Sequence, residues 1–345
     1  MKTENVKELL KTTAYDFLRT NEHLGDNTIL LTLGGSHAYG TSKETSDVDV
    51  RGIAANSKKD ILLMRDFEQV IDKPTDTTIY SLHKMLGLLA NNNPNTIEIL
   101  GCKPEHYFHK SIIGQSLLDN ADMFLSKRAI NTFGKYAESQ LRRLENKTLL
   151  ELEEKRRQEH IKKTIEKAWY SIEDRYAEFS KTDHINIEVF ATPNNEERDH
   201  DLFITTVLSQ YPLRDCRSIL SEIDAIVRSF DKIGDRNAKA MEKDKIGKHS
   251  MHLLRLYMMC IDLLEKHEII TYREDDHDLL MAIRNDEFLD ENGIPTKEFY
   301  KIVDEYERRL EIAAARTTLP DRPDFERIEK WKIWANNKII CGEAF

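Results

Sequence analysis

The sequence has few cysteines and no long apolar run, and each shortage excludes a class of protein. Its four cysteines stand alone, with no pair at CxxC spacing, which argues against a disulfide framework and a structural zinc site. No stretch approaches the roughly 18 apolar residues of a membrane span, and the polar N-terminus does not resemble a signal peptide. We therefore expect a cytoplasmic protein with reduced thiols and no membrane partner.

Basic residues are outnumbered as well. The 345-residue chain has 51 Lys and Arg against 61 Asp and Glu, and its formal net charge is -10. A chain with this balance is not a general polyanion binder, so nucleic acid would have to bind through a local basic face. The length predicts two domains.

The apolar pattern changes near residue 111. Before it, helical spacing over 4–22 is followed by short β-branched runs, one of them interrupted by Pro74, and by the helical run "LHKMLGLLANN". After it, helical runs dominate, at 111–125, 127–150, 151–180, 216–231, 246–267, 277–285 and 297–315. We predict an α+β fold, with a small mixed-sheet core over 1–110 and a larger, mainly α-helical domain over 111–345. A strand-like "INIEVFA" and an acidic loop at 182–201 indicate an insertion or a small hairpin.

The stretch "LGGSHAYGTSKETSDVDVRG" contains two aspartates, Asp47 and Asp49, on a predicted strand. Side chains alternate along a strand, so these carboxylates would share one face about 7 Å apart. Two carboxylates so placed repel each other, and they suit Mg²⁺, which prefers oxygen ligands and shares them with substrate phosphates. Two exposed aspartates on an edge strand are the alternative interpretation.

A glycine-rich turn precedes these aspartates. Gly34 and Gly35 allow a ligand to approach the backbone closely, and Ser36 adds a hydroxyl donor. A helix that starts here would offer unpaired N–H groups to a phosphate. Turn and aspartates together predict a metal-dependent nucleotide site.

The whole stretch resembles the active-site signature of the DNA polymerase β nucleotidyltransferase superfamily, which is a strand, Gly-Ser, ten residues and Asp-x-Asp. Ten residues separate Ser36 from Asp47 here. The segments "AYGT" and "SDVDVRG" are similar to segments of the predicted RNA repair pathway DNA polymerase β family. Four further stretches carry this likeness: "IYSLHKMLGLLANNNPNTIEILG", "KIGKHSMHLLRLYMMCIDLLEKHEIITYRE", "LLMAIRN" and "TTLPDRPD". The resemblance runs from about residue 30 to 325, but no family motif falls within 140–235.

The resemblance implies transfer of a nucleotide from a nucleoside triphosphate with two Mg²⁺ ions, for which Mn²⁺ is a substitute. Asp47 and Asp49 would bind the metals. A third carboxylate on a neighbouring strand would complete the site, and Asp76 stands where the family places it. Glu98 and Glu68 remain alternatives for that third acid.

Other residues near the motif are candidates for nucleotide binding. Arg51 would share the face of the aspartates and either pair with them or contact a phosphate. Tyr39 would contact the nucleotide or pack, and Lys84 on the following helix would reach a triphosphate. The nucleotide-binding set is therefore Gly35, Ser36, Tyr39, Arg51 and Lys84.

A cationic stripe lies on the later helical run "KIGKHSMHLLRLYMMC". Lys248, His252 and Arg255 fall on one face of a largely apolar helix. Such charges must meet a carboxylate, a phosphate or solvent, so we expect this face to line the substrate cleft, with an internal salt bridge or a domain rim as alternatives. Arg273 and Arg284 would extend a local basic path for RNA.

The leading hypothesis is a nucleotidyltransferase that adds a nucleoside monophosphate to an RNA 3′ hydroxyl during RNA repair, plausibly of cleaved tRNA. A protein hydroxyl is the first alternative acceptor, as in AMPylating antitoxins of toxin–antitoxin type, and a small molecule is the second. An idle nucleotide-binding module is the alternative from another class. The sequence leaves the base preference and the oligomeric state open.

Overall fold

The structure is a computed structural model that describes residues 3–149, 188–191, 202–205, 212–218, 220–221, 224, 246–291 and 293–344. The chain divides into two compact units, one made of Met1–Leu141 with Ile246–Phe345 and the other of Arg142–Lys245. The predicted boundary at residue 110 stays a prediction. The predicted helix at 151–180 and most of that at 216–231 lie outside the described residues.

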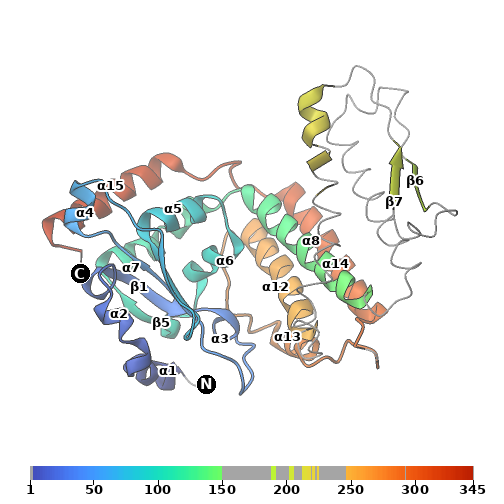
Figure 1. Ribbon diagram of the computed structural model, residues 1–345, viewed down its shortest axis with the longest axis horizontal. Coiled ribbons are helices and arrows are strands. Elements are labelled where there is room, and N and C mark those ends of the chain that lie inside the picture. Colours follow the sequence, from blue (N-terminus) through green and yellow to red (C-terminus); the bar gives the residue numbers. More distant parts are fainter. Residues whose placement is uncertain are drawn as a thin grey trace. The chain divides into compact units, whose positions relative to one another are not determined.

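A mixed five-stranded sheet is the centre of the first unit, which confirms the predicted α+β class (Figure 1). The strand order is β3-β4-β2-β1-β5. Strands β2 and β4 are parallel, and every other neighbouring pair is antiparallel. The strands are β1 (Thr28–Leu33), β2 (Val50–Ala54), β3 (Gln69–Asp72), β4 (Thr77–Ser81) and β5 (Tyr107–Lys110). The break at Pro74 between β3 and β4 is as predicted, whereas β5 was not predicted.

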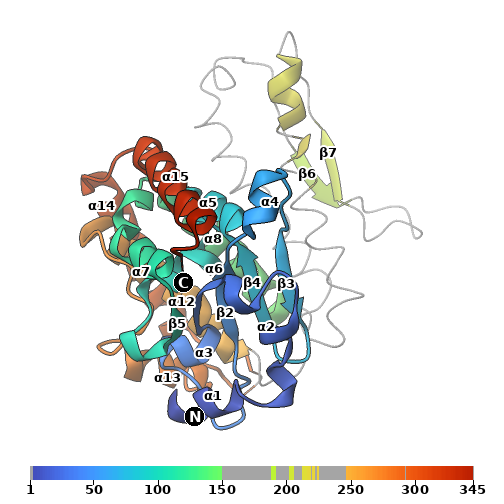
Figure 2. The ribbon, with the colours of Figure 1, turned by 90° about the vertical axis from the view of Figure 1, so that its left-hand side faces the viewer.

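Helices cover both faces of this sheet. Helix α5 (Leu82–Ala90) packs against β2 and β4, and α7 (Ile112–Asp119) packs against β1 and β5. The N-terminal segment forms one apolar cluster with the other face, which includes Leu33 and Val50. Helix α15 (Phe325–Cys341) lies outside α5 and α7, where it also contacts α4 (Lys58–Leu62) (Figure 2).

The predicted continuous helix over 4–22 is wrong. The segment folds as α1 (Thr3–Leu9), a 3₁₀ turn at Thr13–Tyr15 and α2 (Phe17–Thr20). The guanidinium of Arg19 donates to the carbonyl oxygens of Leu10, Lys11 and Thr12. It thereby binds carbonyl groups that a continuous helix would pair with its own N–H groups.

Helix α12 (Ile246–Glu265) contacts both α13 (His277–Arg284) and α14 (Lys297–Arg316). Helix α8 (Arg128–Leu149) begins in the first unit. In the second unit, β6 (Glu188–Ala191) pairs antiparallel with β7 (Leu202–Thr205). No helix in the described part of the chain has the length and apolarity needed to cross a membrane.

Candidate active site

Asp49 and Asp76 lie side by side at the beginnings of two parallel strands. The register pairs Val50 of β2 with Thr77 of β4, so the residues that precede them are neighbours. Their carboxyl groups form a hydrogen bond. Asp49 is the more enclosed of the two, with 19% of its side chain exposed against 63% for Asp76.

The protonation of the two carboxyl groups is linked. Burial raises the pKa of Asp49 to about 7, and the hydrogen bond to Asp76 adds to the rise. The same hydrogen bond lowers the pKa of Asp76. A pair of carboxyl groups that cannot both ionise cheaply has a strong affinity for a cation placed between them.

Arg51 of β2 contacts both members of this pair. Its Nη2 lies 3.3 Å from Oδ1 of Asp76 and 3.8 Å from Oδ1 of Asp49. Its Nη1 also donates to the backbone carbonyl of Asp76, whose φ of 44° is in the left-handed region. Arg51 thus forms the salt bridge that the sequence left as one of its two possible roles.

The glycine turn lies against the same pair. Helix α3 (Gly35–Tyr39) follows β1 directly, and Gly35 has a φ of 54°. A Cβ atom at Gly35 would collide with Oδ2 of Asp49, and one at Gly34 would lie 2.7 Å from Cγ of Arg51. Both positions therefore require glycine. Ser36 directly follows Gly35, the residue that lies against the Asp49 carboxylate.

Asp47 is exposed and lies in the extended segment before β2. The strand predicted to include it begins at Val50, although the Gly34 N–H still donates to the Asp49 carbonyl at 2.9 Å. Across the described residues, no three His, Cys, Asp or Glu side chains gather in a set that could hold a metal ion. The structure therefore brings together Asp49 and Asp76, and Asp47 does not form such a set with them.

The residues of the predicted cationic stripe on α12 lie in two different environments. Lys248 is exposed, and its charge lowers the pKa of both Asp49 and Asp76, so it lies within electrostatic reach of them. Arg255 is only 1% exposed and donates to Glu98 at 3.1 Å. His252 accepts from Arg255, and burial lowers the pKa of its imidazole to about 3.

Four further predicted residues make their polar contacts with groups other than the aspartate pair. The Tyr39 hydroxyl donates to Glu98, which is itself buried and bound by Arg255. Lys84 lies in the first turn of α5, which follows β4, and it pairs with Glu68. Lys84 is therefore at the opposite end of β4 from Asp76. These contacts favour Asp76 over Glu98 and Glu68 as the third acid.

The two arginines expected to extend a basic path are buried. Arg273 and Arg284 each have 7% relative exposure. Arg273 pairs with Asp262 and Asp276, whereas Arg284 donates to Ser46 in the loop between α3 and β2. Their charges hold loops in place, and the path for RNA along them stays a prediction that their burial does not support. Lys245, three residues before Lys248, lies outside the described residues.

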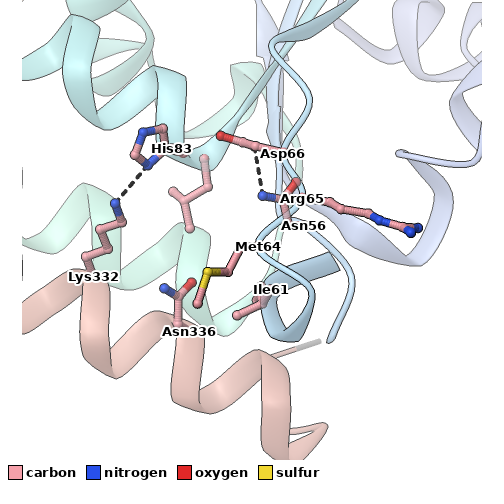
Figure 3. A pocket seen from close by; sticks show the side chains of 9 residues that line it. Asn56, Ile61, Met64, Arg65, Asp66, His83, Lys332 and Asn336 are labelled. Atoms are coloured by element: carbon pink, nitrogen blue, oxygen red, sulfur yellow. Dashed lines mark hydrogen bonds between the residues drawn. The ribbon is translucent and has the colours of Figure 1, made fainter. Parts of the chain in front are cut away.

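A cavity of about 300 Å³ opens at the other end of the sheet (Figure 3). Lys332 and His83 point toward each other across it with 2.8 Å between Nζ and Nδ1, and Asn56 donates to Asp66. None of the predicted site residues lines it. Its walls are formed by Asn56, Ile61, Met64, Arg65, Asp66, Leu82, His83, Lys332 and Asn336.

A comparison with protein families agrees with what the glycine turn and the adjacent aspartates indicate. Residues 9–170 match the model of the RNA repair pathway DNA polymerase beta family. This match confirms the resemblance found in the sequence, and a DNA polymerase beta family implies nucleotidyl transfer. No curated protein and no solved structure matches the chain.

The Glu98 contacts are the part of the site that the sequence did not predict. The sequence offers Glu98 as a candidate metal ligand and Arg255 as a candidate substrate contact, yet in the structure their side chains bind each other. Each is a single charge within an apolar run, "NTIEIL" and "HLLRLYMM". Because a buried charge needs a partner, two such isolated charges of opposite sign are a signal for an internal ion pair.

Proposed function

We propose that this protein is a nucleotidyltransferase that moves a nucleoside monophosphate from a nucleoside triphosphate to the 3′ hydroxyl of an RNA. The observation that carries the proposal is the hydrogen-bonded pair of Asp49 and Asp76, held against Gly35 of the glycine turn. In the reaction, the hydroxyl oxygen bonds to the α-phosphorus, the bond to the bridging oxygen breaks, and pyrophosphate leaves. The hydroxyl proton passes to a carboxylate or to water.

The aspartate pair fits a divalent metal. Its oxygens are hard donors, and Asp49 is partly enclosed, so that burial, followed by the hydrogen bond to Asp76, raises the pKa of its carboxyl group. Asp49 and Asp76 would hold the metal, with Asp47 as the further ligand that the resemblance implies. Bound Mg²⁺ or Mn²⁺ would neutralise charge on the triphosphate and lower the pKa of the attacking hydroxyl.

Residues around the pair suit a triphosphate. Lys248 is exposed and its positive charge reaches the carboxylates, so it is placed to bind phosphate oxygens. Gly35 lies against the Asp49 carboxylate, and Ser36 follows it in α3, so the turn has backbone N–H groups and a hydroxyl near the pair. Arg51 keeps the two carboxylates together when no cation does.

An RNA acceptor is supported by the family match, whose description names an RNA repair pathway. The overall negative charge of -10 means that RNA binding must be local and sensitive to salt. Lys248 is an exposed cation within electrostatic reach of the aspartate pair, and such a local surface would include it.

The test supplies each labelled nucleoside triphosphate with Mg²⁺ or Mn²⁺ to an RNA with a free 3′ hydroxyl, to the same RNA ending in a 3′-deoxynucleotide, and to the protein alone. We expect label on the first RNA only, and none from an Asp49→Asn/Asp76→Asn variant. Label on protein alone would favour the AMPylating alternative. Nucleotide binding without transfer to any acceptor would favour an idle binding module.

A further inference from the structure

A buried ion pair links α12 to the catalytic core. Arg255 of α12 donates from Nη1 to Oε2 of Glu98, at 3.1 Å, and the two side chains are 1% and 9% exposed. Taking two charges out of water is costly, and apolar residues in their place are often as stable. The ion pair is therefore weak evidence for a purely stabilising role. The groups that it contacts indicate what else it does.

Tyr39 joins this pair to helix α3. Its hydroxyl lies 2.8 Å and 3.0 Å from the two oxygens of Glu98, and the guanidinium carbon of Arg255 is 3.5 Å from its ring centroid. Burial raises the pKa of Tyr39 well above its ordinary value, so its hydroxyl remains a neutral donor. We call Tyr39, Glu98 and Arg255 the Glu98 network.

The loop after α12 fastens the same network from another side. The hydroxyl of Thr271 donates to the Glu98 carbonyl at 2.6 Å, and the Arg273 N–H donates to the Tyr39 carbonyl at 3.4 Å. The ring of Tyr272 packs on Gly40, the residue that ends α3. Three separate parts of the chain thus converge on the C-terminal end of a single-turn helix.

The other end of that helix is at the proposed active site. Tyr39 is the last residue of α3 and Gly35 is the first, and Gly35 is in contact range of the Asp49 carboxylate. A rigid single turn transmits a shift at Tyr39 directly to Gly35 and Ser36. A misplacement of about 1 Å is enough to lower the rate of a positioned reaction by on the order of 100-fold.

We propose that the Glu98 network positions helix α3, and with it the glycine turn, against the Asp49 and Asp76 carboxylates. Tyr39, Glu98 and Arg255 act as positioning residues, because their polar groups bind one another instead of a substrate. The rate effect rests on the proposed function, whereas the placement of α3 does not.

Two variants separate positioning from stability. Tyr39→Phe removes one hydroxyl and keeps the ring under Arg255. Glu98→Gln/Arg255→Met removes both charges together, so neither is left buried and unpaired, and stability should largely recover relative to either single variant. Ser126→Ala is the matched control, because it also removes a buried hydroxyl, one that donates to Asn92 at 2.8 Å.

The readouts are amide hydrogen exchange over residues 34–41 and the steady-state constants for nucleotide transfer, both on folded full-length protein. For Tyr39→Phe and the double variant we expect faster exchange in this segment and kcat lower by about 100-fold, with KM for the triphosphate changed less than about threefold. Ser126→Ala should lose stability while it keeps wild-type exchange in the segment and wild-type kcat.

Wild-type exchange over 34–41 in both variants would overturn the proposal, as would full kcat in the double variant. If the wild-type protein transfers no nucleotide, the proposed function fails, yet the exchange measurement still decides whether the network holds α3. Tyr39→Phe alone is sufficient for this decision if the double variant does not fold.

Discussion

Asp49 and Asp76 are neighbours because β2 and β4 are parallel and pair Val50 with Thr77. Had these strands been antiparallel in the same order, the two carboxyl groups would lie at opposite ends of the sheet. The parallel pair instead brings both acids to the edge where the glycine turn leaves β1. Sheet topology, more than the local motif, therefore determines which acid lies beside Asp49.

Asp76→Asn should lower the rate of nucleotide transfer by about 100- to 1,000-fold, because one oxygen donor for the metal and for the transition-state charge is lost. The fold should survive, since the substitution removes one of two repelling carboxylates and leaves Arg51 paired with Asp49. Transfer kinetics and the free energy of unfolding, measured on the same preparation, check both expectations.

Glu68→Gln is the matched control for this substitution. Glu68 was an alternative third acid, but it is exposed and pairs with Lys84 at the far end of β4. Its loss should leave transfer within about threefold of wild type, as for an exposed ion pair. Full activity in Asp76→Asn together with a large loss in Glu68→Gln would reverse the assignment.

Gly35→Ala should abolish most activity through geometry alone. The new methyl group would collide with the Asp49 carboxylate, and a φ of 54° costs a non-glycine residue about 1–2 kcal/mol. Gly87→Ala in α5 is the control, because a methyl group there meets no atom within 4 Å and should stabilise the helix by about 0.5–1 kcal/mol. Wild-type kcat in Gly35→Ala would show that the turn does not contact the reacting groups.

The strands around the motif were predictable because their apolar and β-branched runs are short and bounded by glycine or proline. The N-terminal helix was overpredicted, since its apolar spacing gives no sign that Arg19 binds the carbonyl groups of residues 10–12. Helix α15 was missed, although its buried Ile328, Trp331, Ala335 and Ile339 have helical spacing after the N-cap Asp324.

The site was predictable to the extent that its residues are close in sequence. Gly35, Ser36 and Asp49 follow from one motif, whereas the roles of Arg255 and Glu98 depend on a contact between residues distant in sequence. Helical spacing places Lys248 and Arg255 on one face, but it cannot say that this face is exposed at one end and buried at the other. Only the packing of α12 against the core separates them.

Lys248→Gln should raise KM for the nucleoside triphosphate by about tenfold, as expected for loss of a hydrogen bond to a charged group. The effect should shrink at high salt, because Lys248 is exposed and its charge is screened. Lys330→Gln on α15 is the control, since Lys330 is an exposed lysine paired with Glu326. An unchanged KM for both triphosphate and RNA would remove Lys248 from substrate binding.

His252→Gln should make the protein less sensitive to acid. The imidazole is partly buried and accepts a hydrogen bond from Arg255, so it stays neutral in the folded state, and burial lowers its pKa to about 3 from an ordinary value of 6.5. Between these two values the unfolded chain binds a proton that the folded protein does not. Stability is therefore lost as the pH falls below about 6.5, by up to about 1.4 kcal/mol per pH unit for this one group.

Glutamine keeps an acceptor for Arg255 but does not titrate. Between pH 7 and pH 5, the free energy of unfolding of the wild-type protein should therefore fall by about 2 kcal/mol more than that of His252→Gln, measured by urea titration. His109→Gln, at an exposed position on β5, should behave like wild type. Equal acid sensitivity in wild type and His252→Gln would mean that the imidazole is already protonated in the folded state, and therefore that its contact with Arg255 opens to solvent before the protein unfolds.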